Sequence, residues 1–336
     1  MKIVFPLPAL TPPQGWQTLI SRVKRYIPIL FEVTMRRTTA WLQFVRAPNL
    51  FTVPGDPLAG FFLAGGAIGA QARPLALACC VGLLLYAAGL VLNDLADEAT
   101  DAEERPGRPL PSGRIRRTSA HGALFLFATA AGISSLFCGE HTPALATALA
   151  WAVVAYNLWT KRIPVLGELN MGACRALNVL IGASAAGAAP YVPFLALGAA
   201  SVFLYIVAVT MVARFEANPA RSGTGIWAPL LTTGFLCALI ALPTFHSGHP
   251  NRITGLAAAA AWILTVGIAY MKVKRTDQEL RTSVVPSAIG VFVRGLIPLQ
   301  ACLVAMSGMP GSAVAAICLL ALFIPATFVG RYIYGS

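Results

Sequence analysis

The sequence is dominated by apolar runs of about the length that a helix needs to cross a lipid bilayer. A spanning helix takes about 20 mostly apolar residues, because its backbone polar groups must bond within the segment. Charged residues make up only 11% of the chain, against about 25% in soluble domains. We therefore expect an all-α, polytopic membrane protein, a helical bundle of nine or ten transmembrane helices. The runs are residues 50–71, 75–93, 119–138, 143–160, 169–190, 192–213, 226–245, 254–271, 284–306 and 311–331.

The positions of Lys and Arg predict how these helices are oriented. With a cytoplasmic N-terminus, 21 of the 25 Lys and Arg residues fall in cytoplasmic segments, and only Arg73 and Arg252 fall in loops on the other side. Loops retained in the cytoplasm collect positive charge. We expect a multi-pass protein of a bacterial inner (cytoplasmic) membrane, with its N-terminus in the cytoplasm. The same rule accounts for the net charge of +12, so the expected partner is membrane lipid and not nucleic acid.

Three segments are expected along the chain. Residues 1–46 contain apolar side chains at helical spacing and suggest an interfacial amphipathic helix, with a poorly ordered tail as the alternative; they do not resemble a signal peptide, because the early apolar stretch is short and broken by proline. Residues 47–306 form the membrane domain. Residues 307–336 add one C-terminal hydrophobic helix.

One acidic cluster interrupts this apolar pattern at the cytoplasmic end of the second run. Asn93, Asp94, Asp97 and Asp101 are spaced to share one face of a continuing helix. Like charges at this spacing repel each other, so a bound cation is expected among them. Mg²⁺ suits the site, since one or two carboxylates commonly hold it together with substrate phosphates. The alternative is a solvated acidic helix end.

A proline-rich basic loop, residues 105–114, follows the acidic cluster. Its prolines and glycines break the helix, and the stiff loop is expected to fold Arg105 and Arg108 back over the carboxylates. Guanidinium groups there would grip phosphate oxygens. The alternative is ordinary positive charge on a cytoplasmic loop.

At these residues the chain resembles the UbiA family of intramembrane prenyltransferases. The pattern Asn93, Asp94, Asp97, Asp101 with the downstream Arg-Pro loop matches its first motif, and the likeness covers approximately residues 40–305. The resemblance implies a bundle around a central cavity, Mg²⁺ as cofactor, and a polyprenyl diphosphate and a prenyl acceptor as substrates. It implies that Asp94, Asp97 and Asp101 hold Mg²⁺–diphosphate and act in catalysis with Lys161. The implied diphosphate-binding set is Asn93, Arg105, Arg108, Lys161 and Arg162.

The family's second acidic motif has no clear counterpart in this chain. Where two or more Asp are expected, after the sixth run, the sequence has Arg214 and Glu216. The preceding segment, residues 167–178, resembles a divergent, EboC-like branch of the family. An acceptor pocket is expected from both stretches together with Tyr156, and a structural Glu168–Arg175 polar cluster is the alternative. The expected pocket residues are Tyr156, Glu168, Arg175, Asn178, Arg214 and Glu216.

These features favour Mg²⁺-dependent transfer of a prenyl group from a polyprenyl diphosphate to a small acceptor, aromatic or not, or to a lipid acceptor, at the cytoplasmic face. The degenerate second motif supports a rival, a noncatalytic isoprenoid or lipid-precursor binding or export component. A secondary transporter is a further rival, because it would place ionisable groups such as Arg175 and Arg294 near the midplane.

Overall fold

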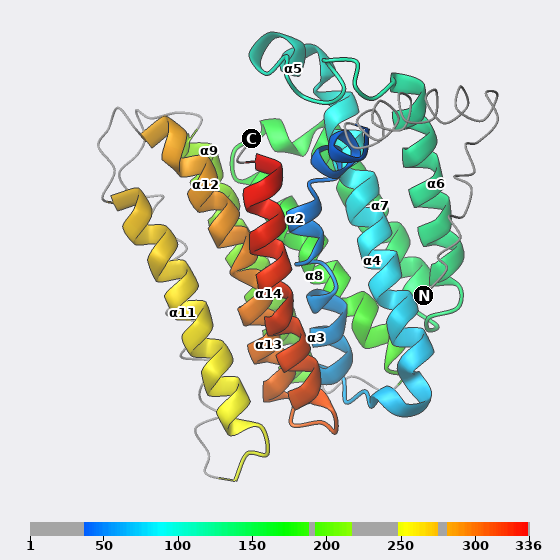
Figure 1. The fold of residues 1–336 in the computed structure, drawn as a ribbon. Helices are drawn as coiled ribbons and strands as arrows, with labels where there is room; N and C mark the ends of the chain where they lie inside the picture. The colour runs from blue at the N-terminus through cyan, green and yellow to red at the C-terminus, as the bar shows by residue number, and fades with distance from the viewer. Residues whose placement is uncertain (1–36, 188–191, 217–247, 275–280, 335–336) are drawn as a thin grey trace, which may run out of the picture.

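The structure is a computed structural model that describes residues 37–187, 192–216, 248–274 and 281–334, except some side chains at the segment ends. Throughout these ranges the regular structure is helical, with no strand, which confirms the all-α class (Figure 1). The elements are α2 (Ala47–Leu50), α3 (Gly55–Leu63), α4 (Ile68–Ala96), α5 (Glu98–Glu104), α6 (Arg117–Ser135), α7 (Thr142–Leu158), the 3₁₀ helix η1 (Thr160–Arg162), α8 (Leu166–Ala185), α9 (Val192–Glu216), α11 (Arg252–Lys274), α12 (Arg281–Arg294), α13 (Leu296–Met306) and α14 (Ser312–Tyr334).

Nine of the ten predicted apolar runs fall on these helices, and the run 226–245 lies outside the described residues. Within the described ranges, five helices are long and apolar enough to cross a membrane, and α7 is a shorter apolar helix. The count of nine or ten spans therefore stays a prediction. The five are Ile68–Ala96, Phe194–Arg214, Arg252–Lys272, Ala288–Met306 and Ser312–Ile333.

The first run, expected as one helix, is broken between α2 and α3. Prolines at positions 48, 54 and 57 lack the backbone N–H that a continuous helix needs. The break leaves the carbonyls of Thr52 and Val53 to side chains of other helices. Arg175 and Gln300 donate to Thr52 O at 3.1 and 2.9 Å, and Asn178 donates to Val53 O at 3.3 Å.

Small residues let α3 and α8 pack closely. A Cβ atom at Gly60 would overlap the carbonyl of Val179, and one at Gly182 would overlap the carbonyl of Pro57. Membrane helices use such small residues because close backbone approach increases van der Waals contact. This crossing places the polar side chains of α8 beside the α2–α3 break.

A small second core fixes the segment before α2 against the end of α4. Ala40 and Phe44 are buried with Val91 of α4, with Leu110 of the proline-rich loop and with Ile115 just after it. At the same end of the bundle lie α5 and the C-terminal end of α14, as Figure 1 shows. The segment before α2, the α4–α5 region and the end of α14 are distant in sequence, and they converge where the acidic cluster lies.

The C-terminal helix α14 packs against α13 and α2. Its end also meets the segment before α2, since Gln43 Nε2 donates to the carbonyl of Ile333 at 3.4 Å. The division into segments 47–306 and 307–336 stays a prediction, and most of the predicted segment 1–46 lies outside the described residues.

Candidate functional site

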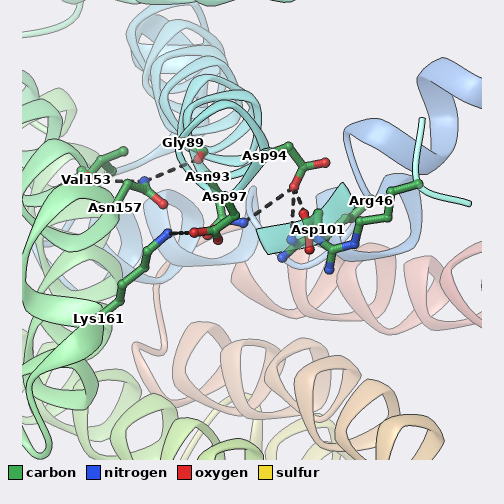
Figure 2. A network of polar contacts seen from close by, with 10 residues as sticks. Arg46, Gly89, Asn93, Asp94, Asp97, Asp101, Val153, Asn157 and Lys161 are labelled. Atoms are coloured by element: carbon green, nitrogen blue, oxygen red, sulfur yellow. Dashed lines mark hydrogen bonds and ion pairs between the residues drawn. The ribbon is translucent and has the colours of Figure 1, made fainter. Parts of the chain in front are cut away.

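The acidic cluster lies at a bend between two helices. α4 ends at Ala96, Asp97 has φ −100° and ψ 5°, and α5 begins at Glu98. The prediction that the cluster shares one helix face is wrong for Asp97, because this residue stands at the bend itself and its carboxylate contacts Lys161. Figure 2 shows Asp94 and Asp101 near Arg46, whereas Asp97 is directed to Lys161.

Two buried carboxylates share a single guanidinium. Arg108 Nη1 lies 3.7 Å from Asp94 Oδ1 and also forms a close ion pair with Asp101 Oδ2. Arg46 Nη2 lies 3.4 Å from Asp94 Oδ1, and Asn93 Nδ2 donates to the same oxygen at 3.4 Å. Carboxylates removed from water need such compensation. A positive charge therefore sits between the two acidic side chains.

The proline-rich loop folds back over the cluster, in the arrangement that its sequence predicts. Ser112 Oγ donates to the carbonyl of Arg108 at 2.6 Å, and the N–H of Ile115 donates to the carbonyl of Pro109 at 3.0 Å. These bonds hold Arg108 toward the carboxylates. Arg105 is exposed, but it lines the same pocket.

That pocket has a volume of about 470 Å³, and its lining is strongly basic. Four of its residues are arginines, and Asp94 is its one acidic residue. Arg114 donates to neutral groups, Gln43 Oε1 at 2.8 Å and the carbonyl of Gly107 at 2.6 Å. The pocket therefore suits an anion. Its lining is Gln43, Arg46, Asp94, Arg105, Gly107, Arg108, Pro109, Arg114 and Ile333.

Lys161 approaches the cluster from the opposite side. Its Nζ lies 2.6 Å from Asp97 Oδ1. Asn157, which sequence reasoning did not single out, donates to the carbonyl of Gly89 at 3.3 Å and so ties α7 to α4. Tyr156 is half-buried, and Arg162 is exposed. Of the two basic residues in η1, Lys161 is thus the one that the structure brings to the carboxylates.

Arg214 and Glu168 form an ion pair next to η1. Arg214 Nε lies 2.8 Å from Glu168 Oε1, and Arg214 Nη2 donates to the carbonyl of Lys161 at 2.9 Å. The alternative of a Glu168–Arg175 cluster is therefore wrong, because the guanidinium that reaches Glu168 comes from α9. The side chain of Glu216 lies outside the described residues.

Arg175 and Asn178 belong to a second, fully buried polar cluster. Arg175 Nη1 lies 3.1 Å from Asp56 Oδ2, and Asn178 donates to the same oxygen at 3.1 Å. Gln300 Nε2 donates to Asp56 Oδ1 at 2.5 Å. These contacts favour a structural role for Arg175 and Asn178 over the predicted acceptor contact.

Asp56 and Gln300 were missed by the sequence analysis. The available signal was a lone carboxylate at position 56 inside an apolar run, since ionisable residues in membrane segments are costly and almost always have a specific partner.

The chemistry of the acidic cluster fits one Mg²⁺ ion. No three His, Cys, Asp or Glu side chains lie together as a metal-ligand set in the part of the chain that the structure describes. Asp94 and Asp101, however, already converge on one cationic nitrogen. Two carboxylates completed by phosphate oxygens and water are a usual Mg²⁺ environment. A three-carboxylate site that includes Asp97 receives no such support, because Asp97 is directed to Lys161.

The model of the UbiA prenyltransferase family matches residues 57–283, more than half of the chain. Among curated relatives, the digeranylgeranylglyceryl phosphate synthase of Korarchaeum cryptofilum is 37% identical over 116 residues, 34% of this chain and 40% of the relative. The synthase of the same name from Methanoculleus marisnigri is 31% identical over 173 residues, 51% of this chain and 60% of the relative. The chain thus spans about half the length of the curated relatives that it matches.

Solved structures share the fold at low sequence identity. A UbiA homolog from Aeropyrum pernix K1 gives a TM-score of 0.58 at 16% identity, covering 76% of this chain and 96% of the homolog. A UbiA homolog from Archaeoglobus fulgidus, solved with DMAPP and Mg²⁺, gives 0.53 at 13% identity, covering 78% and 99%.

Proposed function

Because the chain belongs to the UbiA prenyltransferase family, we propose that it transfers a prenyl group from a polyprenyl diphosphate to an acceptor, with Mg²⁺, at the cytoplasmic side of a bacterial inner membrane. The observation that carries this proposal is the pair of buried carboxylates, Asp94 and Asp101, that converge on Arg108 at the edge of a basic pocket. That arrangement offers a divalent cation its ligands and a diphosphate its counter-charges.

Each part of the site has a distinct task in the proposed reaction. The bond between C1 of the prenyl chain and the diphosphate oxygen breaks, and the diphosphate leaves with the electron pair. C1 then accepts an electron pair from the acceptor, and the acceptor releases a proton to solvent. Asp94 and Asp101 would hold Mg²⁺, which supplies Lewis-acid stabilisation of the leaving group. Arg46, Arg108 and Lys161 would bind phosphate oxygens, because their charged N–H groups already face the carboxylate cluster.

An acceptor that carries a phosphate is supported better than a neutral aromatic one. The pocket has four arginines against one carboxylate, and the hydrogen bonds of Arg114 within the described residues all go to neutral groups. Relatives named digeranylgeranylglyceryl phosphate synthase point to the same class of acceptor. Tyr156, Glu168 and Arg214 stay in the proposed substrate region, whereas Arg175 and Asn178 are left out of it.

The proposal is tested by product formation in membranes that contain the full chain. Radiolabelled GPP and Mg²⁺ are added, and the organic extract is separated and analysed by mass spectrometry. We expect a prenylated product that requires Mg²⁺ and is lost with Asp94→Asn. Glu104→Gln, a neutralised but exposed carboxylate of α5, is the matched control and should form product normally.

The noncatalytic rival gives a different result in the same assay. A binding or export component would retain Mg²⁺-dependent affinity for GPP and form no labelled product under any acceptor supplied. An Asp94→Asn variant as active as the unmodified chain would refute the assignment of the site.

A further inference from the structure

The second half of the site, by which we mean the Arg214–Glu168 pair beside η1, has too few carboxylates to hold a metal ion. Between Glu168 and Asp277 the sequence contains one acidic residue, Glu216, and no Asp at all. Glu168 itself is buried and paired with Arg214. A second hard cation would need oxygen ligands of its own. Among the described side chains, this stretch offers one carboxylate, Glu168, which is already paired with a guanidinium, and the sequence adds only Glu216, whose side chain lies outside the described residues. The residues therefore do not fit a second Mg²⁺.

Arg214 occupies a supported position in this half of the site. Its Nε contacts Glu168 at 2.8 Å, and its Nη2 bonds to the carbonyl of Lys161 at 2.9 Å and lies 3.5 Å from the carbonyl of Ile163. Its side chain is nevertheless 34% exposed, while that of Glu168 is 4% exposed. The carboxylate thus anchors the guanidinium from the buried side and leaves part of it open to a ligand.

Lys161 joins this half of the site to the acidic half. Its backbone carbonyl accepts the hydrogen bond from Arg214, and its ammonium group contacts Asp97 at 2.6 Å. Lys161 therefore contacts both Arg214 and a carboxylate of the acidic cluster. Arg214 thus contacts the backbone of the residue whose ammonium group we propose to bind the diphosphate.

The packing of α8 leaves room for this arginine. A Cβ atom at Gly167 would lie 3.2 Å from Arg214 Nη2 and 2.9 Å from the carbonyl of Thr160. A side chain at position 167 would therefore press on both the guanidinium and the η1 turn. Glycine at the start of α8 allows Arg214 to pass over this turn.

From these contacts we propose that Arg214 supplies the cationic contact to the diphosphate that a second metal ion would otherwise supply, so that the site works with a single divalent ion. A guanidinium can donate two parallel hydrogen bonds to phosphate and always carries its charge. Glu168 is the positioning residue for Arg214. The inference rests on the proposed function, since it concerns the same diphosphate.

The direct test is a count of metal ions per bound diphosphate. The purified full chain is equilibrated with GPP and Mn²⁺ in place of Mg²⁺, with no acceptor added, and bound metal and bound GPP are both measured. We expect one Mn²⁺ for each GPP. Two Mn²⁺ ions for each GPP would overturn the inference while leaving the proposed function intact.

Variants at position 214 test the role of the guanidinium through affinity. Arg214→Gln should weaken Mn²⁺-dependent GPP binding by about 10- to 100-fold, as expected for loss of charged hydrogen bonds. Arg214→Lys should lose less, because it keeps the charge. Equal affinity in the Gln variant and the unmodified chain would show that Arg214 only braces the η1 turn, and would also overturn the inference.

A glycine variant checks the result without changing any charge. Gly167→Ala should weaken GPP binding in the same direction as Arg214→Gln, because the added methyl group presses on the carbonyl of Thr160 and on the guanidinium that packs over this turn. Gly122→Ala in α6, where a Cβ atom meets nothing within 4 Å, is the control and should bind normally. Absence of Mn²⁺-dependent GPP binding in the unmodified chain would reject the proposed function together with this inference.

Discussion

Two polar regions of the molecule contain the same kinds of side chain but differ in access to solvent. In the cluster at the α4–α5 bend, Arg46, Arg108 and Lys161 have side chains that are 33%, 25% and 14% exposed. In the cluster around Asp56, the side chains of Arg175 and Asp56 are 7% and 0% exposed. Cations that reach solvent can exchange a carboxylate for a ligand phosphate, whereas buried ones hold fixed partners. We therefore assign ligand binding to the first region and helix packing to the second.

The largest effect is expected in the buried region. Asp56→Leu leaves Arg175 as an uncompensated buried charge, which should lower the free energy of unfolding by about 3–5 kcal/mol. Thermal unfolding in detergent measures this change. The double variant Asp56→Leu with Arg175→Met should recover much of the loss. A stable single variant that no longer binds GPP would contradict the division between the two regions.

The next largest effect is expected at the acidic cluster, and there it should appear in function and not in stability. Asp94→Asn should reduce the rate of prenyl transfer by about 100-fold, since loss of a metal ligand costs at least as much as loss of a supporting partner. Unfolding temperatures, measured on the same preparations, should change little. A large loss of stability with normal transfer per folded molecule would reverse our assignment.

A smaller effect is expected on the opposite side of the cluster. Lys161→Gln should weaken Mg²⁺-dependent GPP binding by about 10-fold, because it removes one charged hydrogen-bond donor. Equilibrium binding with labelled GPP measures the change. Arg116→Gln, which removes an exposed positive charge directly before α6, is the control. Equal losses in both variants would mean that only the overall charge of this face matters.

The smallest effect concerns the link between η1, which carries Lys161, and α8. Val165 has a φ of 70°, a conformation that a β-branched residue adopts at a cost. Val165→Gly should therefore raise the free energy of unfolding by about 1 kcal/mol. A parallel gain or loss of GPP affinity would show whether the strained turn also positions Lys161. A free energy of unfolding in detergent that is lower for Val165→Gly than for the unmodified chain would contradict the strain argument.

The sequence predicted the helices better than it predicted their partners. Apolar runs of helix length identify α4, α8 and α14 directly, because lipid requires each segment to satisfy its own backbone. The break before α3 was missed, since Pro54 and Pro57 stand in a run that is still apolar overall. The carbonyls that this break exposes are satisfied by residues from α8 and α13, and such pairings depend on which helices pack together.

The same limit applies to the site. The sequence was sufficient to predict that Arg108 lies over the carboxylates, because Asp94 and Asp101 have helical spacing and the Arg-Pro loop follows them directly. The bend at Asp97 was not predictable from helical spacing, because it separates side chains that one continuous helix would align. The Arg214–Glu168 pair joins two helices, and sequence spacing gives no information on such a contact.

The central claim is that Asp94 and Asp101 hold a divalent cation that binds a prenyl diphosphate. Equilibrium binding of labelled GPP to the purified full chain, with Mg²⁺ or with EDTA, tests it most directly. We predict saturable binding that requires Mg²⁺ and disappears in both Asp94→Asn and Asp101→Asn. Equal binding with and without the metal, or undiminished binding in these variants, would contradict the claim.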